Sequence, residues 1–228
     1  MKTHKKESKK FGPLLAGARA GDTYTGVSYG NDLACQICGH RHPLYETQLV
    51  YEICRNLIKL MLRQDPLPPA MMIGVLRSNN EIYYAGCSRA DGTIGQIAFE
   101  NAIRAGRFVL PAIRLVGNLP ADGSVSRGGR TVSASAIRAC TVASQPVAGN
   151  CVAPKLIHIA TQQDAPRPWR LSEVLFDPTL GNENYRHLDT AESCQSCRRL
   201  LPLLLCKKGP EVDLRSFFGM IRARDNWQ

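Results

Sequence analysis

The sequence predicts an α/β fold, in which helices pack on a central β-sheet. From Leu44 to Arg63, apolar residues recur at steps of three and four, which is the spacing of an amphipathic helix. Two strand-like runs follow, Met71–Arg77 and Glu81–Cys87, and the Ser78-Asn79-Asn80 segment between them predicts a β-hairpin. We expect the helix to cover the sheet to which these strands belong.

Further along the chain the pattern alternates between helix and strand. The expected elements are a helix at Ile94–Ala105, a helix at 152–163, a strand at Leu171–Phe176 and a helix that starts near Cys194. Residues 106–149 contain Gly, Ser, Pro and Arg without regular spacing, and so long a connection is usually functional or flexible. We predict two parts: residues 1–68 with a basic arm, a candidate zinc knuckle and the amphipathic helix, and residues 69–228 as the main domain.

The composition favours a polyanionic partner. The 228 residues suffice for one full core, and their formal net charge is +10. Arginines are dense between residues 104 and 140, where Asp122 is the one acid, which indicates contact with nucleic acid. No run of 18 apolar residues occurs, so we expect no membrane-spanning helix.

Cys194 and Cys197 form a pair suited to metal binding. They lie three residues apart at the start of an apolar run, so on a first helical turn both thiolates face one metal. Cys151 also precedes a helical stretch, and Asn150 and Ser193 are residue types that cap helix N-termini. Three cysteines from two helix starts would hold zinc with one coordination position open, as in catalytic sites.

A second Cys-x-x-Cys pair lies near the N-terminus. Cys35 and Cys38 are followed by Gly39, as in a zinc knuckle. The further ligands expected for this second metal are His40, His42 and Cys54. The alternative is a reduced pair of thiols at a helix start. Nine cysteines, an odd number with two such pairs, favour metal in a reducing compartment over a disulfide scaffold.

The two segments around Asn150-Cys151-Val152-Ala153 and Ser193-Cys194-Gln195-Ser196-Cys197 resemble the zinc-dependent cytidine deaminase-like superfamily. Its pattern is His or Cys, any residue, Glu, and then a distant Pro/Ser-Cys-x-x-Cys. The Ser before the Cys pair, and the stretch Trp169–Val174, are most similar to the bacterial deaminases delivered as toxins. The resemblance covers about residues 70–206.

This resemblance implies a fold, an activity and partners. The fold would be a three-layer α-β-α sheet with zinc at two helix N-termini, here with a small N-terminal helical and zinc-knuckle extension. The activity would be hydrolytic deamination of cytosine in nucleic acid, with single-stranded DNA favoured and RNA as an alternative. An immunity protein would be a further partner, and no membrane is involved. The basic N-terminus lacks an apolar segment, so we expect the cytoplasm of the producing cell or, after delivery, of a target cell.

Position 153 departs from the family pattern. Ala153 stands where the family has its proton-carrying Glu, and an alanine cannot move protons, so the chain should be nearly inactive. Three interpretations are open. The change is an engineered Glu-to-Ala substitution, the chain is a natural pseudoenzyme, or a substitute acid such as Glu173 or Glu192 acts instead.

Five residues are candidates for substrate contact. Asn150 would bind the base edge or the ribose, and Ser193 would border the base pocket. Trp169 would stack on an extruded base, although a Trp next to a strand is also typical of a core. Arg127 and Arg130 would contact phosphates.

Three rival functions remain at the level of sequence. The substrate is adenine or a free nucleotide, or the chain is a non-catalytic, zinc-containing nucleic-acid-binding module, or it is a disulfide-bonded effector domain. The second rival requires a closed site, in which Cys206 or Cys140 is the fourth ligand beside Cys194 and Cys197.

Overall fold

The computed structural model describes residues 23–30, 32–89, 92–106, 113–179, 189–191 and 193–208. In order, their elements are β1 (Tyr24–Tyr29), β2 (Leu44–Thr47), α1 (Gln48–Met61), β3 (Met71–Arg77), β4 (Tyr83–Cys87), α2 (Ile94–Gly106), β5 (Ile113–Leu115), β6 (Gly123–Val125), β7 (Thr131–Ser133), α3 (Ala134–Ala139), α4 (Val152–Gln162), β8 (Arg170–Phe176) and α5 (Gln195–Leu205). The basic arm and Glu192 lie outside the described residues.

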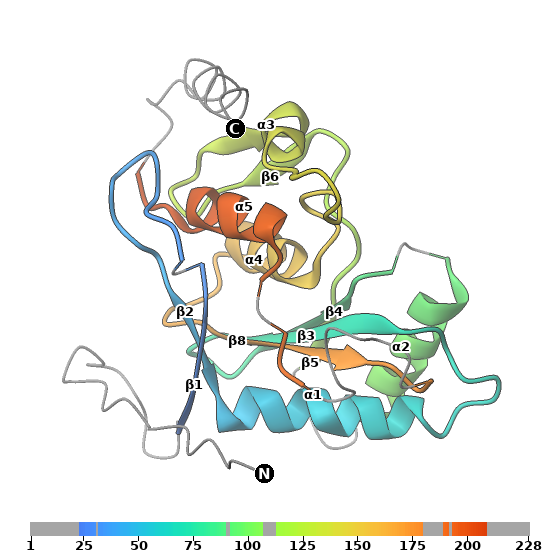
Figure 1. The fold of residues 1–228 in the computed structure, drawn as a ribbon. Coiled ribbons are helices and arrows are strands. Elements are labelled where there is room, and N and C mark those ends of the chain that lie inside the picture. Colours follow the sequence, from blue (N-terminus) through green and yellow to red (C-terminus); the bar gives the residue numbers. More distant parts are fainter. Residues whose placement is uncertain are drawn as a thin grey trace, which may run out of the picture.

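Within these ranges the chain forms a mixed six-stranded sheet in the order β1-β2-β8-β3-β4-β5, with a separate β6-β7 ribbon. Helices α1 and α2 cover one face, and α4 and α5 lie on the other (Figure 1). The expected α/β class is therefore confirmed. The part of the chain that the structure describes contains no helix with both the length and the apolar character needed to cross a bilayer.

The middle of the sheet follows the sequence pattern closely. β3 and β4 form the predicted antiparallel hairpin, with Ile73 opposite Cys87. β8 pairs antiparallel with the whole length of β3 and is buried at every residue, which confirms it as a central strand. β5 and β2 add parallel partners to β4 and β8 respectively.

The predicted division after residue 68 runs through this sheet. β1 and β2 precede that point, yet β2 pairs with β8, and α1 packs against β3 and β8. The predicted helix at Leu44–Arg63 begins only at Gln48, because the four residues before it extend into β2. There Glu46 is buried and accepts a hydrogen bond from Thr25 on β1 at 2.6 Å.

The segment predicted as an irregular connection contains three short strands and α3. Ser133 caps α3 by accepting a hydrogen bond from the Ala136 amide at 3.2 Å. Strands of three residues are too short to show a periodic pattern, so periodicity could not predict them.

The first turn of α4 lies directly on the sheet. A Cβ atom on Gly74 of β3 would come within 2.6 Å of Val152 Cγ1, so only glycine permits this approach. Gly86 of β4 also faces Val152, at an ordinary 3.5 Å. This close contact sets the position of Cys151, the residue before α4.

Candidate metal centre

Three cysteines converge where α4 and α5 begin. The sulfur atoms of Cys151, Cys194 and Cys197 lie within 4.8 Å of one another, and those of Cys151 and Cys194 are 3.6 Å apart. The predicted meeting of these two segments is therefore present in the structure. Asn150 and Ser193 each lie one residue before the N-cap, because Cys151 and Cys194 themselves adopt the extended N-cap conformation.

The surroundings favour a thiolate at Cys194. Hydrogen bonds from the thiols of Cys151 and Cys197 hold the pKa of Cys194 far below its ordinary value, and the amides of Cys197 and Ser196 at the start of α5 act in the same direction. The pKa of Cys151 is raised in turn by its hydrogen bond to Cys194, and the pKa of Cys197 is raised by its hydrogen bonds to Cys151 and Cys194. A bound metal would displace these protons.

A buried carboxylate lies beside the three sulfurs. Glu173, in the middle of β8, accepts a hydrogen bond from the backbone amide of Ala153 at 2.9 Å. Burial raises the pKa of Glu173 to about 7, against the opposing effect of the Ala153 amide. Its own backbone amide donates to the Tyr29 hydroxyl at 2.8 Å, which holds the strand in place at this point. The Glu173 carboxyl group is thus hydrogen-bonded to Ala153, the position at which the family pattern has its Glu.

The cysteines and Glu173 line one cavity of about 490 Å³. Its apolar walls come from Met71, Met72 and Leu175, and Arg89 and Ser193 contribute polar groups. The Ser193 hydroxyl is buried and has no hydrogen-bond partner among the described residues. An unpaired buried hydroxyl on a cavity wall suits a ligand atom.

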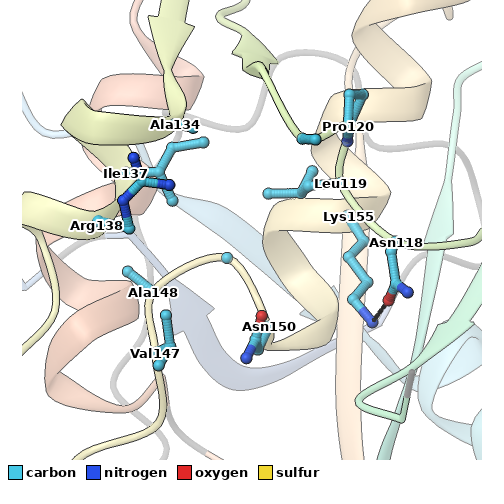
Figure 2. A pocket seen from close by; sticks show the side chains of 12 residues that line it. Asn118, Leu119, Pro120, Ala134, Ile137, Arg138, Val147, Ala148, Asn150 and Lys155 are labelled. Atoms are coloured by element: carbon cyan, nitrogen blue, oxygen red, sulfur yellow. Dashed lines mark hydrogen bonds between the residues drawn. The ribbon is translucent and has the colours of Figure 1, made fainter.

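Asn150 faces a different, smaller pocket of about 230 Å³ (Figure 2). The Lys155 ammonium on α4 lies across this pocket and donates to Asn118 Oδ1 at 2.8 Å and to the Cys87 carbonyl at 3.0 Å. Lys155 is buried, which the sequence did not lead us to expect. The structure therefore does not bring Asn150 to the cysteine cavity.

Trp169, Arg127 and Arg130 also lie away from that cavity. Trp169 is 4% exposed, and its indole N–H donates to the Ala165 carbonyl at 3.0 Å, so it is part of the core. The Arg127 amide donates to the Leu204 carbonyl at 2.7 Å, and the Arg130 guanidinium to Leu203 at 3.2 Å. These contacts hold both arginines at the C-terminal end of α5, opposite to Cys194.

Of the partners predicted for the N-terminal cysteine pair, the structure brings His42 to it and adds Cys206, which was not predicted. Cys35, Cys38 and His42 meet Cys206, which follows α5. His40 is exposed and outside this group, and Cys54 lies on the buried face of α1, where its thiol donates to the Ser172 carbonyl at 3.7 Å. The predicted roles of His40 and Cys54 are corrected accordingly.

The first cluster therefore gains no fourth cysteine within the described residues. Cys206 belongs to the N-terminal group, and the Cys140 thiol donates to the Ala136 carbonyl at 3.5 Å. A set of three thiolates fits a soft metal such as zinc and leaves room for one more ligand.

Comparison with known proteins finds no matching family model, no matching curated protein and no matching solved structure. The resemblance to the deaminase superfamily thus stays a prediction. The α/β sheet and two groups of side chains that could hold a metal ion are observed directly.

Proposed function

We propose that this chain is a zinc-dependent hydrolytic deaminase of cytosine in nucleic acid, with single-stranded DNA as the favoured substrate. The observation that supports this most strongly is the group of three cysteines at two helix N-termini, next to a buried carboxylate in one cavity. The sheet order and the helices on both faces are compatible with the three-layer fold that the motif implies.

Each residue of the site has a role in this proposal. Cys151, Cys194 and Cys197 hold the zinc, which when bound would activate water for attack on C4 of the base. Glu173 accepts the proton from the attacking water at a carboxylate oxygen and passes protons to N3 and then to the departing amine. Cytosine and water thus become uracil and ammonia, with no other reactant.

Glu173 replaces the missing Glu at position 153 in this scheme. Its carboxylate is hydrogen-bonded to the Ala153 amide and lines the cavity together with the cysteines. Burial raises its pKa to about 7, which suits a group that both takes up and releases protons near neutral pH. Of the three interpretations of Ala153, the substitute acid is the one that this geometry supports.

The cavity also suits a flat, partly apolar ligand. Met71, Met72 and Leu175 provide apolar walls for the faces of a base, and the unpartnered Ser193 hydroxyl can bond to a polar edge. Nucleic acid rather than a free nucleoside is favoured by the net charge of +10.

The decisive experiment measures conversion of cytosine to uracil in single-stranded oligonucleotides by the zinc-loaded chain. We expect activity in the chain itself and a loss of roughly 10²–10⁴-fold in Glu173→Gln. Glu52→Gln, a half-exposed carboxylate on α1, is the matched control and should retain full activity.

A second variant, Ala153→Glu, separates the remaining interpretations. If the unaltered chain is silent and Ala153→Glu is active, then the Glu-to-Ala interpretation is right and Glu173 is not the proton carrier. Silence of both on DNA, RNA and nucleosides would favour the non-catalytic nucleic-acid-binding module instead.

A further inference from the structure

A second group of metal-ligand side chains lies outside the proposed active site. The ligand atoms of Cys35, Cys38, His42 and Cys206 lie within 4.8 Å of one another. The Cys38 sulfur is 3.1 Å from His42 Nε2, and Cys35 and Cys206 are fully buried. Four sulfur and nitrogen donors in so small a volume match the number and type of ligands in structural zinc sites.

The loop from Cys35 to His42 already has the conformation that such a site needs. The Gly39 amide donates to the Cys35 carbonyl at 2.7 Å, and the Cys35 amide to the His40 carbonyl at 2.8 Å. Gly39 has a φ of +74°, in the left-handed region that favours glycine. This tight turn places both cysteines of the pair on one side of the loop, as in a zinc knuckle.

Contacts with the 127–130 segment hold the chain near Cys206 in place. The Arg127 amide and the Arg130 guanidinium bind the last carbonyl groups of α5, at Leu204 and Leu203. The backbone near Gly128 also lies against that of Lys207 and Lys208, because a Cβ at Gly128 would come within 2.6 Å of Lys207 backbone atoms. These contacts bring Cys206 beside the Cys35–His42 loop, where a metal would add a further link.

Three cationic side chains lie near this cluster. Arg130 acts electrostatically on Cys206, and Arg127 and Lys207 act on His42. Three thiolates with one divalent metal carry a net charge of about −1, which these cations offset. This charge arrangement suits a filled metal site better than a set of neutral thiols.

We propose that Cys35, Cys38, His42 and Cys206 bind one structural zinc ion. With four protein ligands the site has no open position, so it performs no chemistry. It links the N-terminal knuckle to the C-terminal end of α5, whose N-terminal end carries Cys194 and Cys197. Helix α5 is thereby held at both ends, and the structural ion keeps the catalytic cysteines in place.

The first test counts zinc per chain after purification under reducing conditions. We expect two zinc ions in the unaltered chain and one in the double variant Cys38→Ala, His42→Ala, because three thiolates alone would still hold zinc whereas two ligands would not. His40→Ala removes the exposed neighbouring histidine and should keep two. His42→Cys exchanges one zinc ligand for another and should also keep two, which separates metal binding from a general packing role.

The second test uses Co²⁺ as a probe in Cys194→Ser, in which the proposed catalytic site is disabled. We expect one Co²⁺ with a tetrahedral, thiolate-rich spectrum that added imidazole does not change, because no coordination position is open. Two zinc ions in the Cys38→Ala, His42→Ala double variant, or a Cys194→Ser variant that binds no Co²⁺, would overturn this proposal. Neither result depends on whether the chain deaminates cytosine.

Discussion

The two cysteine clusters combine similar residues in different numbers. Each combines a Cys-x-x-Cys pair with a cysteine distant in sequence, but His42 completes the N-terminal cluster, whereas the cluster at Cys151 has three ligands among the described residues. The three-ligand cluster lines a cavity of about 490 Å³. Under the two proposals, one additional ligand separates a site that would carry out chemistry from a site that would only stabilise the fold.

The charged side chains beside the two clusters also differ. Glu173 lies beside the three-ligand cluster, and a carboxylate can carry protons. Arg130 lies beside the four-ligand cluster, where its charge can neutralise thiolates. The neighbours of each cluster therefore agree with the role proposed for it.

The largest expected effect is in the order in which a chelator removes the two metal ions. Titration of the zinc-loaded chain with a chelator should abolish activity first, because the three-ligand site exposes its metal to the cavity. The structure should unfold only when the second ion leaves, since structural zinc binding contributes about 10–16 kcal/mol in small zinc domains. Activity and circular dichroism measured on the same samples check this order. Simultaneous loss of both signals would show that the two sites do not differ.

A second substitution should weaken zinc binding at one cluster only. Gly74→Ala places a Cβ 2.6 Å from Val152 Cγ1 and should displace the start of α4, at a cost of about 1–3 kcal/mol. Zinc affinity should fall at the Cys151 cluster and stay unchanged at the other. Gly86→Ala, where the same contact would be 3.5 Å, is the control and should bind both ions normally. Equal behaviour of the two variants would contradict the proposed dependence of Cys151 on this contact.

The carboxylate beside the three-ligand cluster should make stability depend on pH. Burial raises the pKa of Glu173 from 4.5 to about 7, so between these values the folded chain retains a proton that the unfolded chain has lost. Stability should therefore fall as the pH rises from about 4.5 to about 7, by on the order of 1 kcal/mol per pH unit, and level off above that. Three thiolates with one zinc ion are still anionic, so the metal does not reverse this sign. Denaturant unfolding of Glu173→Gln should lack this slope, and an unchanged slope would assign it to another group.

The smallest effect concerns the substrate side of the cavity. Ser193→Ala removes the unpartnered hydroxyl and should lower kcat/KM by about tenfold, which corresponds to one hydrogen bond. Both zinc ions should remain bound, because Ser193 is a ligand of neither. Loss of zinc in this variant would mean that the hydroxyl supports the metal cluster rather than the substrate.

Local patterns in the sequence predicted the parts of the molecule that depend on local physics. The hairpin, the central strand and the two helix starts at Cys151 and Cys194 follow from periodicity and spacing, and the convergence of three sulfurs follows from a motif. The predicted N-caps, Asn150 and Ser193, lie one residue before the observed ones, because cysteine is an unusual cap residue.

Features that depend on the tertiary fold could not be predicted in this way. Cys206 joins the knuckle only because α5 ends beside that loop, and no spacing rule connects the two segments. The sequence predicts phosphate contact for Arg127 and Arg130, but in the structure they donate to carbonyl groups at the end of α5. Trp169 lies in the core for a similar reason, since its indole N–H finds a partner at Ala165.

The most direct measurement is an anomalous difference map at the zinc absorption edge, from crystals of the unaltered chain grown under reducing conditions. The proposals predict two peaks. One is ligated by Cys151, Cys194, Cys197 and a solvent molecule, and the other by Cys35, Cys38, His42 and Cys206. A fourth protein ligand at the first peak, or no peak beside Glu173, would contradict them.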